Sequence, residues 1–184
     1  MADVSVRPAS PADVDEIARI QVETWHFSYA DLLPAAALAG LDVARAVQAW
    51  TPAVTSPPSS KHHVLVGLEG TWTVGFTALA PSDDLQPSDP DQEATVTVGP
   101  LIVEPRWRRR GHGSRLMAAA VDHARSDGMR RAVAWLPESD TGTKEFLAGA
   151  GWAADGLVRA LDTGAGELRE IRMQVWLETG TASV

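Results

Sequence analysis

The sequence predicts an α/β protein with one mixed β-sheet and helices on both faces of that sheet. Segments rich in β-formers alternate with amphipathic segments in the order β-α-α-β-β-β-α-β-α-β-β. A strand–helix–strand unit over residues 96–136 implies a central parallel pair, whereas the other strands can pair antiparallel. The 184 residues suffice for one core, so we expect a single domain over residues 1–184.

The first part of the chain predicts one strand and two helices. Val4 and Val6 alternate with polar residues, which is typical of a strand with one buried face. Ser10 is a natural N-cap and Pro11 suits the first position of a helix, so a helix should begin here. The two helices should cover residues 11–29 and 35–50.

A hairpin and an acidic connection follow. Residues 63–69 and 71–79 are rich in β-formers, and Glu69-Gly70 between them is typical of a hairpin turn. Residues 81–93 are polar and contain five carboxylates. Because such runs rarely bury, we expect a solvated surface connection.

The next strand, over residues 94–103, is interrupted by Gly99-Pro100. Proline has no N–H to donate to a ladder, so it marks either a bulge or a simple edge strand. A bulge here would separate the strand from its parallel neighbour and leave a slot. The remaining elements should be helices over residues 113–127 and 140–150 and strands over residues 130–136, 157–161 and 168–177, with a frayed tail over residues 178–184.

The composition argues against several classes of function. A net charge of −8 is unsuited to a dedicated nucleic-acid binder, which needs a basic face to neutralise phosphates. The absence of cysteine removes disulfides, thiolate metal sites and a cysteine nucleophile, and no metal site is expected. No apolar run reaches the length of a membrane span, and the first residues lack the pattern of a signal peptide. We therefore expect a cytoplasmic protein.

A basic loop, defined as residues 106–115, precedes the helix over residues 113–127. It holds five of the sixteen basic residues. Gly111 and Gly113 let backbone N–H groups converge, and the N-terminus of the following helix favours a negative charge. The loop therefore predicts an anion site. The alternative is a tight strand-to-helix turn with solvated arginines.

This loop resembles the acetyl-CoA motif of the GNAT superfamily of N-acetyltransferases, Q/R-x-x-G-x-G/A, here Arg108-Arg-Arg-Gly111-His-Gly113. The strand before it ends in Leu101-Ile-Val103-Glu-Pro105, similar to the family's apolar-x-V-x-P. The order of elements agrees, and the resemblance covers nearly the whole chain. Further similar stretches are Trp25, Tyr29 and Leu32-Leu-Pro34 in the first helix pair, and Phe146-Leu-Ala-Gly-Ala-Gly-Trp152 late in the chain.

The resemblance implies a GNAT-like fold with a splayed central strand pair, and acetyl transfer from acetyl-CoA to a primary amine of a small molecule, an amino-acid derivative or a peptide. It implies that the amides of residues 109–114 hold the pyrophosphate and that Leu101 and Val103 hydrogen-bond the pantetheine arm. It also implies a homodimer, without pointing to the residues that form one. The implied cofactor-binding residues are Leu101, Ile102, Val103, Arg108, Arg109, Arg110, Gly111, His112, Gly113, Ser114, Arg115, Asp140 and Lys144.

The expected catalytic residues depart from the family pattern. Thr97 stands where many relatives carry a strand glutamate, and Leu147 stands where they often carry a tyrosine. The alternative to an enzyme is therefore a catalytically weak acyl-CoA-binding sensor. The candidate catalytic residues are Glu93, His26 and Tyr29, and the candidate substrate-binding residues are Trp25, Tyr29 and Trp72.

Each candidate has a structural alternative. Glu93 also suits a solvated loop, His26 a surface histidine and Asp140 a helix N-cap, while most of the seven tryptophans suit a core. His112 lies within the basic loop and is predicted to contact the anion rather than to act as a base.

Overall fold

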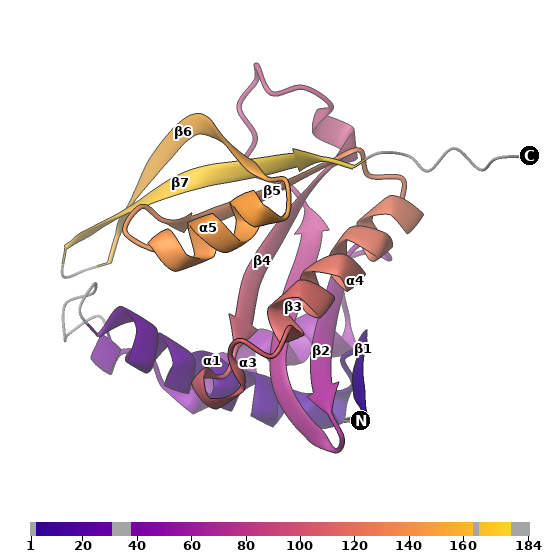
Figure 1. The fold of residues 1–184 in the computed structure, drawn as a ribbon, viewed down its shortest axis with the longest axis vertical. Coiled ribbons are helices and arrows are strands. Elements are labelled where there is room, and N and C mark those ends of the chain that lie inside the picture. The colour runs from indigo at the N-terminus through magenta and orange to yellow at the C-terminus, as the bar shows by residue number, and fades with distance from the viewer. Residues whose placement is uncertain (1–2, 31–37, 164–165, 178–184) are drawn as a thin grey trace, which may run out of the picture.

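A computed structural model describes residues 3–30, 38–163 and 166–177. They form a seven-stranded sheet in the order β1-β2-β3-β4-β5-β7-β6, with helices on both faces (Figure 1). The predicted mixed α/β fold is confirmed. The elements are β1 (Val4–Pro8), η1 (Pro11–Asp13), α1 (Val14–Tyr29), α3 (Val43–Thr55), β2 (His63–Glu69), β3 (Trp72–Pro81), η2 (Gln92–Ala94), β4 (Thr95–Val103), η3 (Pro105–Trp107), α4 (His112–Ser126), β5 (Arg131–Pro137), α5 (Thr141–Gly149), β6 (Ala153–Asp162) and β7 (Glu167–Trp176).

The sheet separates two hydrophobic cores. Leu116 of α4 and Leu147 of α5 pack on one face against the inward side chains of β2, β3, β4, β5 and β7. Ile17 and Ile20 of α1 pack on the other face, against β2, β3 and β4. Because side chains of a strand alternate between faces, β2, β3 and β4 contribute to both cores. The central pair β4 and β5 is parallel, and the other pairs are antiparallel.

The first helical segment begins where the sequence predicts. Ser10 is the N-cap and Pro11 the first residue of η1, which runs directly into α1. The Asp13 carboxylate accepts hydrogen bonds from the Ser10 N–H and hydroxyl, both at 2.7 Å, and from Arg7 at 2.8 Å. The Arg7 guanidinium, helped by Ser10, lowers the pKa of Asp13 to about 2. This ion pair attaches the start of the helix to β1.

The bounds predicted for the second helix are wrong. Residues 38–39 are helical and a turn at Gly40 ends that segment. Asp42 then caps α3 by accepting from the Arg45 N–H at 2.8 Å, and α3 continues past residue 50 to Thr55. Packing of Ala53 and Val54 against the α1-side core extends the helix through its internal proline. Residues 35–37, and the tail over residues 178–184, lie outside the described residues.

The acidic connection after β3 is not wholly solvated, contrary to expectation. The Asp89 side chain is 6% exposed and pairs with Arg131 and Arg172, which are 1% and 2% exposed. Arg172 also pairs with Asp155 of β6 at 2.7 Å. These side chains lie on the same face of the sheet as α1 and α3, but over β5 and β7, which those two helices do not cover. The connection therefore closes that part of the sheet. The sequence does not show this burial, because the partner arginines lie more than forty residues further along the chain.

No helix in the described part of the chain is both long and apolar enough to span a membrane.

We predict that Asp89→Asn lowers the free energy of unfolding by about 3–5 kcal/mol, because it leaves two buried guanidinium groups without their shared carboxylate. Chemical denaturation at pH 7 measures this difference. Asp83→Asn, at an exposed position of the same connection, is the matched control and should change stability by less than about 0.5 kcal/mol.

The same pair predicts a pH dependence. The Arg172 guanidinium holds the pKa of Asp89 well below its ordinary value. The stabilisation is therefore complete above the unfolded-state pKa of about 3.9 and is lost as the pH falls below it. The stability difference between wild type and Asp89→Asn should shrink below about pH 4. A constant difference from pH 7 to pH 3 would contradict this.

Candidate active site

The parallel strands β4 and β5 separate soon after they begin. They pair over only three positions, Thr95–Thr97 against Arg131–Val133. Beyond them, Val98 lies opposite Leu79 of β3 while Leu101 lies opposite Thr77, so Gly99 and Pro100 together face one residue of β3. This is a β-bulge, which bends the strand that contains it. The predicted interruption at Gly99-Pro100 and the predicted splay are confirmed.

Beyond the bulge, β4 has a free backbone edge. The Glu104 N–H donates to the Val74 carbonyl of β3 at 3.0 Å. Because backbone groups alternate in direction along an antiparallel ladder, Ile102 also faces β3, whereas Leu101 and Val103 face away from it. No part of β5 pairs with them there. Leu101 and Val103 therefore present N–H and C=O groups to the space between the strands.

The expected role of Ile102 in cofactor binding does not fit this geometry. Its backbone groups face β3, and its side chain is buried in the α1-side core. The alternation of a strand turns the backbone groups of every second residue toward β3, so Ile102 lines the cleft without offering it the backbone N–H and C=O that Leu101 and Val103 offer.

The space between β4 and β5 is a cleft of about 330 Å³ that extends to both faces of the sheet. Met117 and Leu147 line it from the face covered by α4 and α5. Glu170 of β7 lines it from the opposite face, since its neighbour Ile171 packs into the core with α4 and α5. The other lining residues are Trp25, Thr97, Val98, Gly99, Pro100, Leu101, Ile102, Ala134, Trp135, Leu136, Pro137, Asp140, Thr143 and Arg159.

The basic loop lies at the end of the free edge of β4. Gly111 is the N-cap of α4 with a φ of 82°, a conformation that favours glycine. The first N–H groups of a helix have no partner inside it, so the amides of residues 111–114 are available to a ligand. A Cβ atom added to Gly113 would lie 3.7 Å from Phe146 of α5 and 3.9 Å from Val103. The loop amides, the end of β4 and α5 thus converge.

The arginines of the loop have different surroundings. Arg108 donates to the Ser28 hydroxyl of α1 at 2.7 Å, and Arg106 pairs with Glu104 at 3.0 Å. Arg110 lies over the Trp107 ring, 4.9 Å from its centroid, and Arg115 donates to the Arg110 carbonyl at 3.1 Å. These four side chains hold the loop in place.

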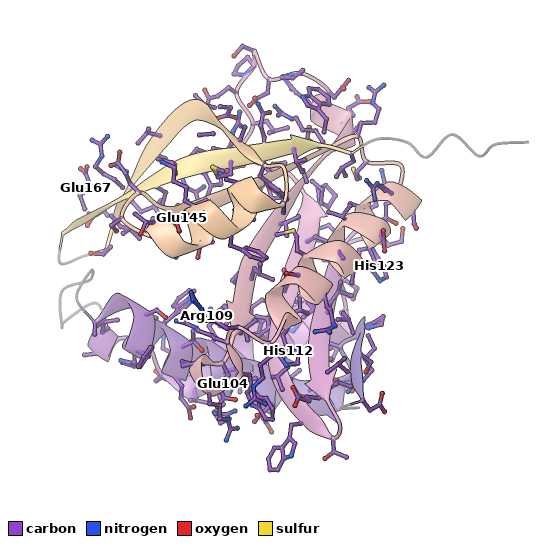
Figure 2. The ribbon with its side chains drawn as sticks, in the orientation of Figure 1. Glu104, Arg109, His112, His123, Glu145 and Glu167 are labelled. Atoms are coloured by element: carbon purple, nitrogen blue, oxygen red, sulfur yellow. The ribbon has the colours of Figure 1, made fainter. Side chains whose placement is uncertain are left out.

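Arg109 differs from the other arginines of the loop. It is exposed and has neither an ion pair nor a side-chain hydrogen bond within the described residues. Its φ of 62° places the backbone in the left-handed region. In the view of Figure 2, Arg109 lies between α1 and α5. Its guanidinium is therefore the one in the loop that no other described side chain or carbonyl engages.

The side chain of His112 does not face the anion site, contrary to expectation. It is 2% exposed and its Nε2 lies 2.8 Å from Glu69 Oε2, at the end of β2. The ring also packs edge-on against Trp107, at 6.2 Å between centroids. Because α4 begins at this residue, its side chain points back to the β2–β3 hairpin while its N–H opens the helix. Only the backbone of His112 can contribute to the anion site.

Two of the expected catalytic residues lie away from the cleft. Glu93 is an exposed residue of η2, before the start of β4, and does not line the cleft. His26 is exposed on α1, and its Nε2 lies 3.3 Å from the Leu41 carbonyl. Both match their structural alternatives, a solvated loop carboxylate and a surface histidine. The side chain of Tyr29, the third candidate, lies outside what the structure describes.

The two tryptophans expected at the substrate site lie far apart in the fold. Trp25 of α1 lines the cleft. Trp72 is 60% exposed at the start of β3, next to the hairpin turn, where Arg106 lies 5.9 Å from its ring centroid. Trp72 does not line the cleft, so the described geometry does not support its expected contact with the substrate.

The described cleft lining contains three ionisable side chains: Asp140, Arg159 and Glu170. Asp140 caps α5, accepting from the Thr143 N–H at 3.0 Å and from its hydroxyl at 2.7 Å, so the N-cap alternative is confirmed. Lys144 is exposed near the start of the same helix. Sequence reasoning missed Arg159 and Glu170, although charged residues two apart in β7, Glu170 and Arg172, were a signal that its second face is polar.

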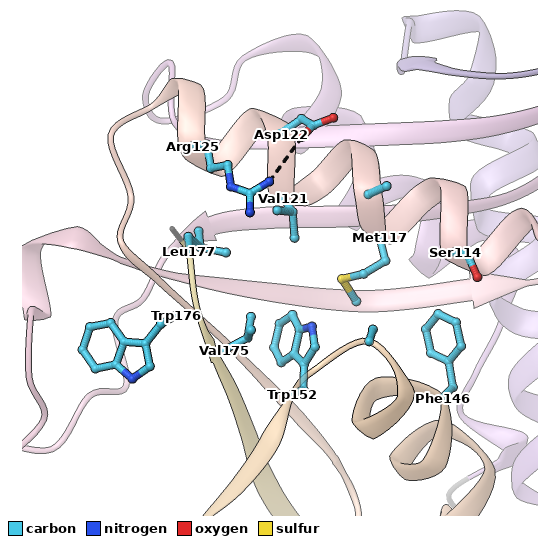
Figure 3. Close-up of a pocket in the computed structure, with 12 residues that line it drawn as sticks. Ser114, Met117, Val121, Asp122, Arg125, Phe146, Trp152, Val175, Trp176 and Leu177 are labelled. Atoms are coloured by element: carbon cyan, nitrogen blue, oxygen red, sulfur yellow. Dashed lines mark ion pairs between the residues drawn. The ribbon is translucent and has the colours of Figure 1, made fainter. Parts of the chain in front are cut away.

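A second cavity of about 310 Å³ lies beside α4 (Figure 3). Met117, Val121, Phe146 and Trp152 make its wall largely apolar, with Ser114 at one end. Its charged lining residues are Asp122 and Arg125, which pair with each other at 3.7 Å. The lining of this cavity includes no residue of β4 and none of the ionisable residues Asp140, Arg159 and Glu170. The cleft between β4 and β5 is therefore the better candidate for a reaction site.

Comparison with known proteins identifies a family. A model described as the Acetyltransferase (GNAT) family matches residues 15–152. The curated mycothiol acetyltransferase of Kineococcus radiotolerans is 36% identical over 103 residues, which are 55% of this chain and 31% of the relative. The match thus covers less than a third of that relative's length.

Solved structures share the fold over nearly the whole chain. For yncA from Salmonella typhimurium, solved with its cofactor acetyl-CoA, the TM-score is 0.70 at 19% identity, covering 98% of each chain. For the PaiA N-acetyltransferase from Thermoplasma acidophilum in complex with coenzyme A, it is 0.74 at 14% identity, covering 95% of this chain and 99% of that one. For the ribosomal-protein-alanine N-acetyltransferase from Brucella melitensis, it is 0.73 at 18% identity, covering 94% and 99%.

We predict that Arg109→Gln weakens the binding of inorganic pyrophosphate about tenfold, because it removes a cation that has no ion pair or side-chain hydrogen bond in the described part of the chain. Titration calorimetry at low salt measures the change. Arg106→Gln removes the same charge from a side chain already paired with Glu104, and should change the affinity by less than about threefold. Equal losses in both variants would show that net charge, rather than the position of Arg109, governs binding.

Proposed function

Because the chain belongs to the GNAT family of acetyltransferases, we propose that it transfers the acetyl group of acetyl-CoA to a primary amine of a small molecule, an amino-acid derivative or a peptide. The observation that carries this proposal is the free edge of β4, which leads to the uncapped N-terminus of α4. An extended chain with amide groups and a pyrophosphate at one end matches that arrangement.

The residues present suit acetyl-CoA. Leu101 and Val103 offer the backbone groups that pantetheine amides require. The amides at the start of α4 suit the pyrophosphate, and Arg109 adds a positive charge. Glycine at position 113 keeps the approach between Val103 and Phe146 open. Asp140 and Lys144, at the start of α5, complete the proposed set, whereas the side chains of Ile102 and His112 do not belong to it.

The proposed reaction is direct attack. The acceptor nitrogen bonds to the acetyl carbonyl carbon, the C–S bond breaks, CoA leaves as the thiolate, and the proton that the amine loses passes to water or to the thiolate. The amine must be neutral to attack, which costs about 4.6 kcal/mol at pH 7 for a lysine-like amine and about 1 kcal/mol for an α-amino group. The acceptor therefore decides how much a general base contributes.

Residues around the cleft favour positioning over proton transfer. Leu147 is buried where relatives often carry a tyrosine, so this side chain cannot protonate sulfur. Thr97 is hydrogen-bonded to the Ser82 hydroxyl at 2.6 Å and has no acidic or basic group. A thiolate is a tolerable leaving group, so orientation of the two substrates in a protected cleft supplies the main contribution.

The substitutions at Thr97 and Leu147 also favour a second candidate, an acyl-CoA-binding sensor with little activity. Release of CoA thiol from acetyl-CoA in the presence of a panel of primary amines separates the two. Turnover that depends on the amine supports the enzyme, and tight CoA binding without turnover of any amine supports the sensor. The homodimer and the cytoplasmic location that the resemblance implies stay predictions.

We predict that Gly113→Glu abolishes CoA binding and preserves the fold. The new Cβ meets its neighbours at ordinary contact distances of 3.7 and 3.9 Å, while the carboxylate brings a negative charge and bulk to the pyrophosphate site. Calorimetric titration with CoA measures affinity, and circular dichroism with thermal melting checks the fold.

Gly149→Glu is the matched control. An added Cβ there has no atom within 4 Å, and the residue lies at the far end of α5 from Asp140. This variant should bind CoA with wild-type affinity. Unchanged CoA affinity in Gly113→Glu would exclude the basic loop as the cofactor site.

A further inference from the structure

The cleft opens on two faces with different chemistry. The face covered by α4 and α5 leads to the basic loop and, in the proposed function, takes up acetyl-CoA. On the opposite face, the cleft is lined by Trp25 of α1, Trp135 of β5, Arg159 of β6 and Glu170 of β7. An acceptor must enter there, because the cofactor occupies the other side. These side chains therefore define what the acceptor can be.

The cation at this opening is already neutralised. Arg159 Nε donates to Glu170 Oε2 at 2.7 Å, and Arg159 Nη1 donates to Asp84 Oδ2 at 2.7 Å. One face of its guanidinium also covers Trp135, with 4.3 Å to the ring centroid. Two carboxylates and one guanidinium leave a net charge of −1 in this group. An acidic substituent of the acceptor would meet no unpaired cation among these residues.

The neighbouring ion pairs do not change this balance. Arg131 and Arg172 face the same side of the sheet but are buried, and they share Asp89, while Arg172 also contacts Asp155. Two cations and two carboxylates cancel. The field at the opening is therefore set by Arg159, Asp84 and Glu170, and it favours a positive ligand.

Glu170 is the carboxylate of this cleft that is suited to bind an ammonium group. Asp140, the other carboxylate of the described lining, is engaged by the N–H and hydroxyl of Thr143 as a helix cap. Glu170 holds Arg159 through Oε2 and lines the cleft together with Trp25 and Trp135. Arg159 already covers the Trp135 ring, so Trp25 is the aromatic side chain that can accompany the carboxylate in contact with a cationic ligand.

We propose that Glu170 binds the acceptor amine as it arrives in its ammonium form, before the proton is lost and the neutral amine attacks, and that the acceptor is a primary amine without a carboxylate next to it. The proposal rests on the acetyl transfer proposed above and narrows its substrate class. An amino acid would place its own carboxylate beside Glu170 and Asp84, where like charges repel and the one cation of the described cleft lining, Arg159, is already paired. Removal of that carboxylate, as in a diamine or an arylalkylamine, removes the repulsion and keeps the ammonium contact.

Matched pairs of acceptors test the substrate class with the wild-type protein. Tyramine against tyrosine, and 1,4-diaminobutane against ornithine, differ by one carboxylate each. We expect kcat/KM, from CoA thiol release, to be at least about tenfold higher for the carboxylate-free member of each pair. A kcat/KM for the amino acids that equals or exceeds the value for the carboxylate-free amines would overturn the proposal. No turnover of either carboxylate-free amine at 10 mM would also overturn it.

Glu170→Gln tests the role of the residue. Glutamine keeps an oxygen for Arg159 but loses the charge that binds ammonium, so KM for the better amine should rise about tenfold or more while kcat changes less than about threefold. Glu170→Asp should recover part of the affinity. Glu167→Gln, on the same strand but exposed and outside the cleft lining, is the control and should keep the wild-type KM (Figure 2). An unchanged KM in Glu170→Gln would contradict the assignment.

CoA titration of each variant separates this proposal from the proposed function. Wild type and Glu170→Gln should bind CoA equally, because Glu170 lies on the acceptor side. If the wild-type protein does not bind CoA, the proposed function fails. If CoA binds and amines turn over without the expected preference, only the acceptor assignment fails.

Discussion

Two neighbouring parallel strands that pair over three residues and then separate are the constraint on which the cleft depends. The bulge at Gly99 and Pro100 bends β4 away from β5, which leaves the backbone groups of Leu101 and Val103 without a strand partner. Unpaired backbone groups need another partner, and an extended ligand with amides can supply it. The same separation opens both faces of the sheet, so that two substrates can approach one point from opposite sides.

The side chains around the cleft serve mainly to hold backbone and charge in place. Four arginines of the basic loop attach it to α1, to the Glu104 carboxylate, to the Trp107 ring or to a carbonyl of the loop itself, and Arg109 has no such described partner. On the other side of the sheet, the connection between β3 and β4 brings Asp89 to Arg131 and Arg172, and Asp84 to Arg159. This connection therefore takes part in shaping the acceptor opening, although its sequence suggests only a solvated loop.

Local patterns predict the elements and the cofactor side well, because both depend on neighbouring residues. The alternation in β4, the break at Gly99-Pro100 and the glycines of the basic loop are all local signals, and the structure confirms the elements that they predict. The acceptor side depends on contacts between distant segments. Glu170 meets Arg159 only through the pairing of β6 with β7, and His112 turns to Glu69 through the packing of α4 on the hairpin. Periodicity and motif spacing do not contain these pairings, so the sequence favours Glu93, His26 and Trp72 and does not indicate Glu170.

The central claim is that the free edge of β4 binds the extended arm of CoA. Residue-resolved amide hydrogen exchange, with and without saturating CoA, tests it most directly. The N–H groups of Leu101 and Val103 should gain strong protection on binding, whereas Ile102, already paired with β3, should exchange at the same rate in both states. CoA binding that protects other amides and leaves Leu101 and Val103 unchanged would contradict the account.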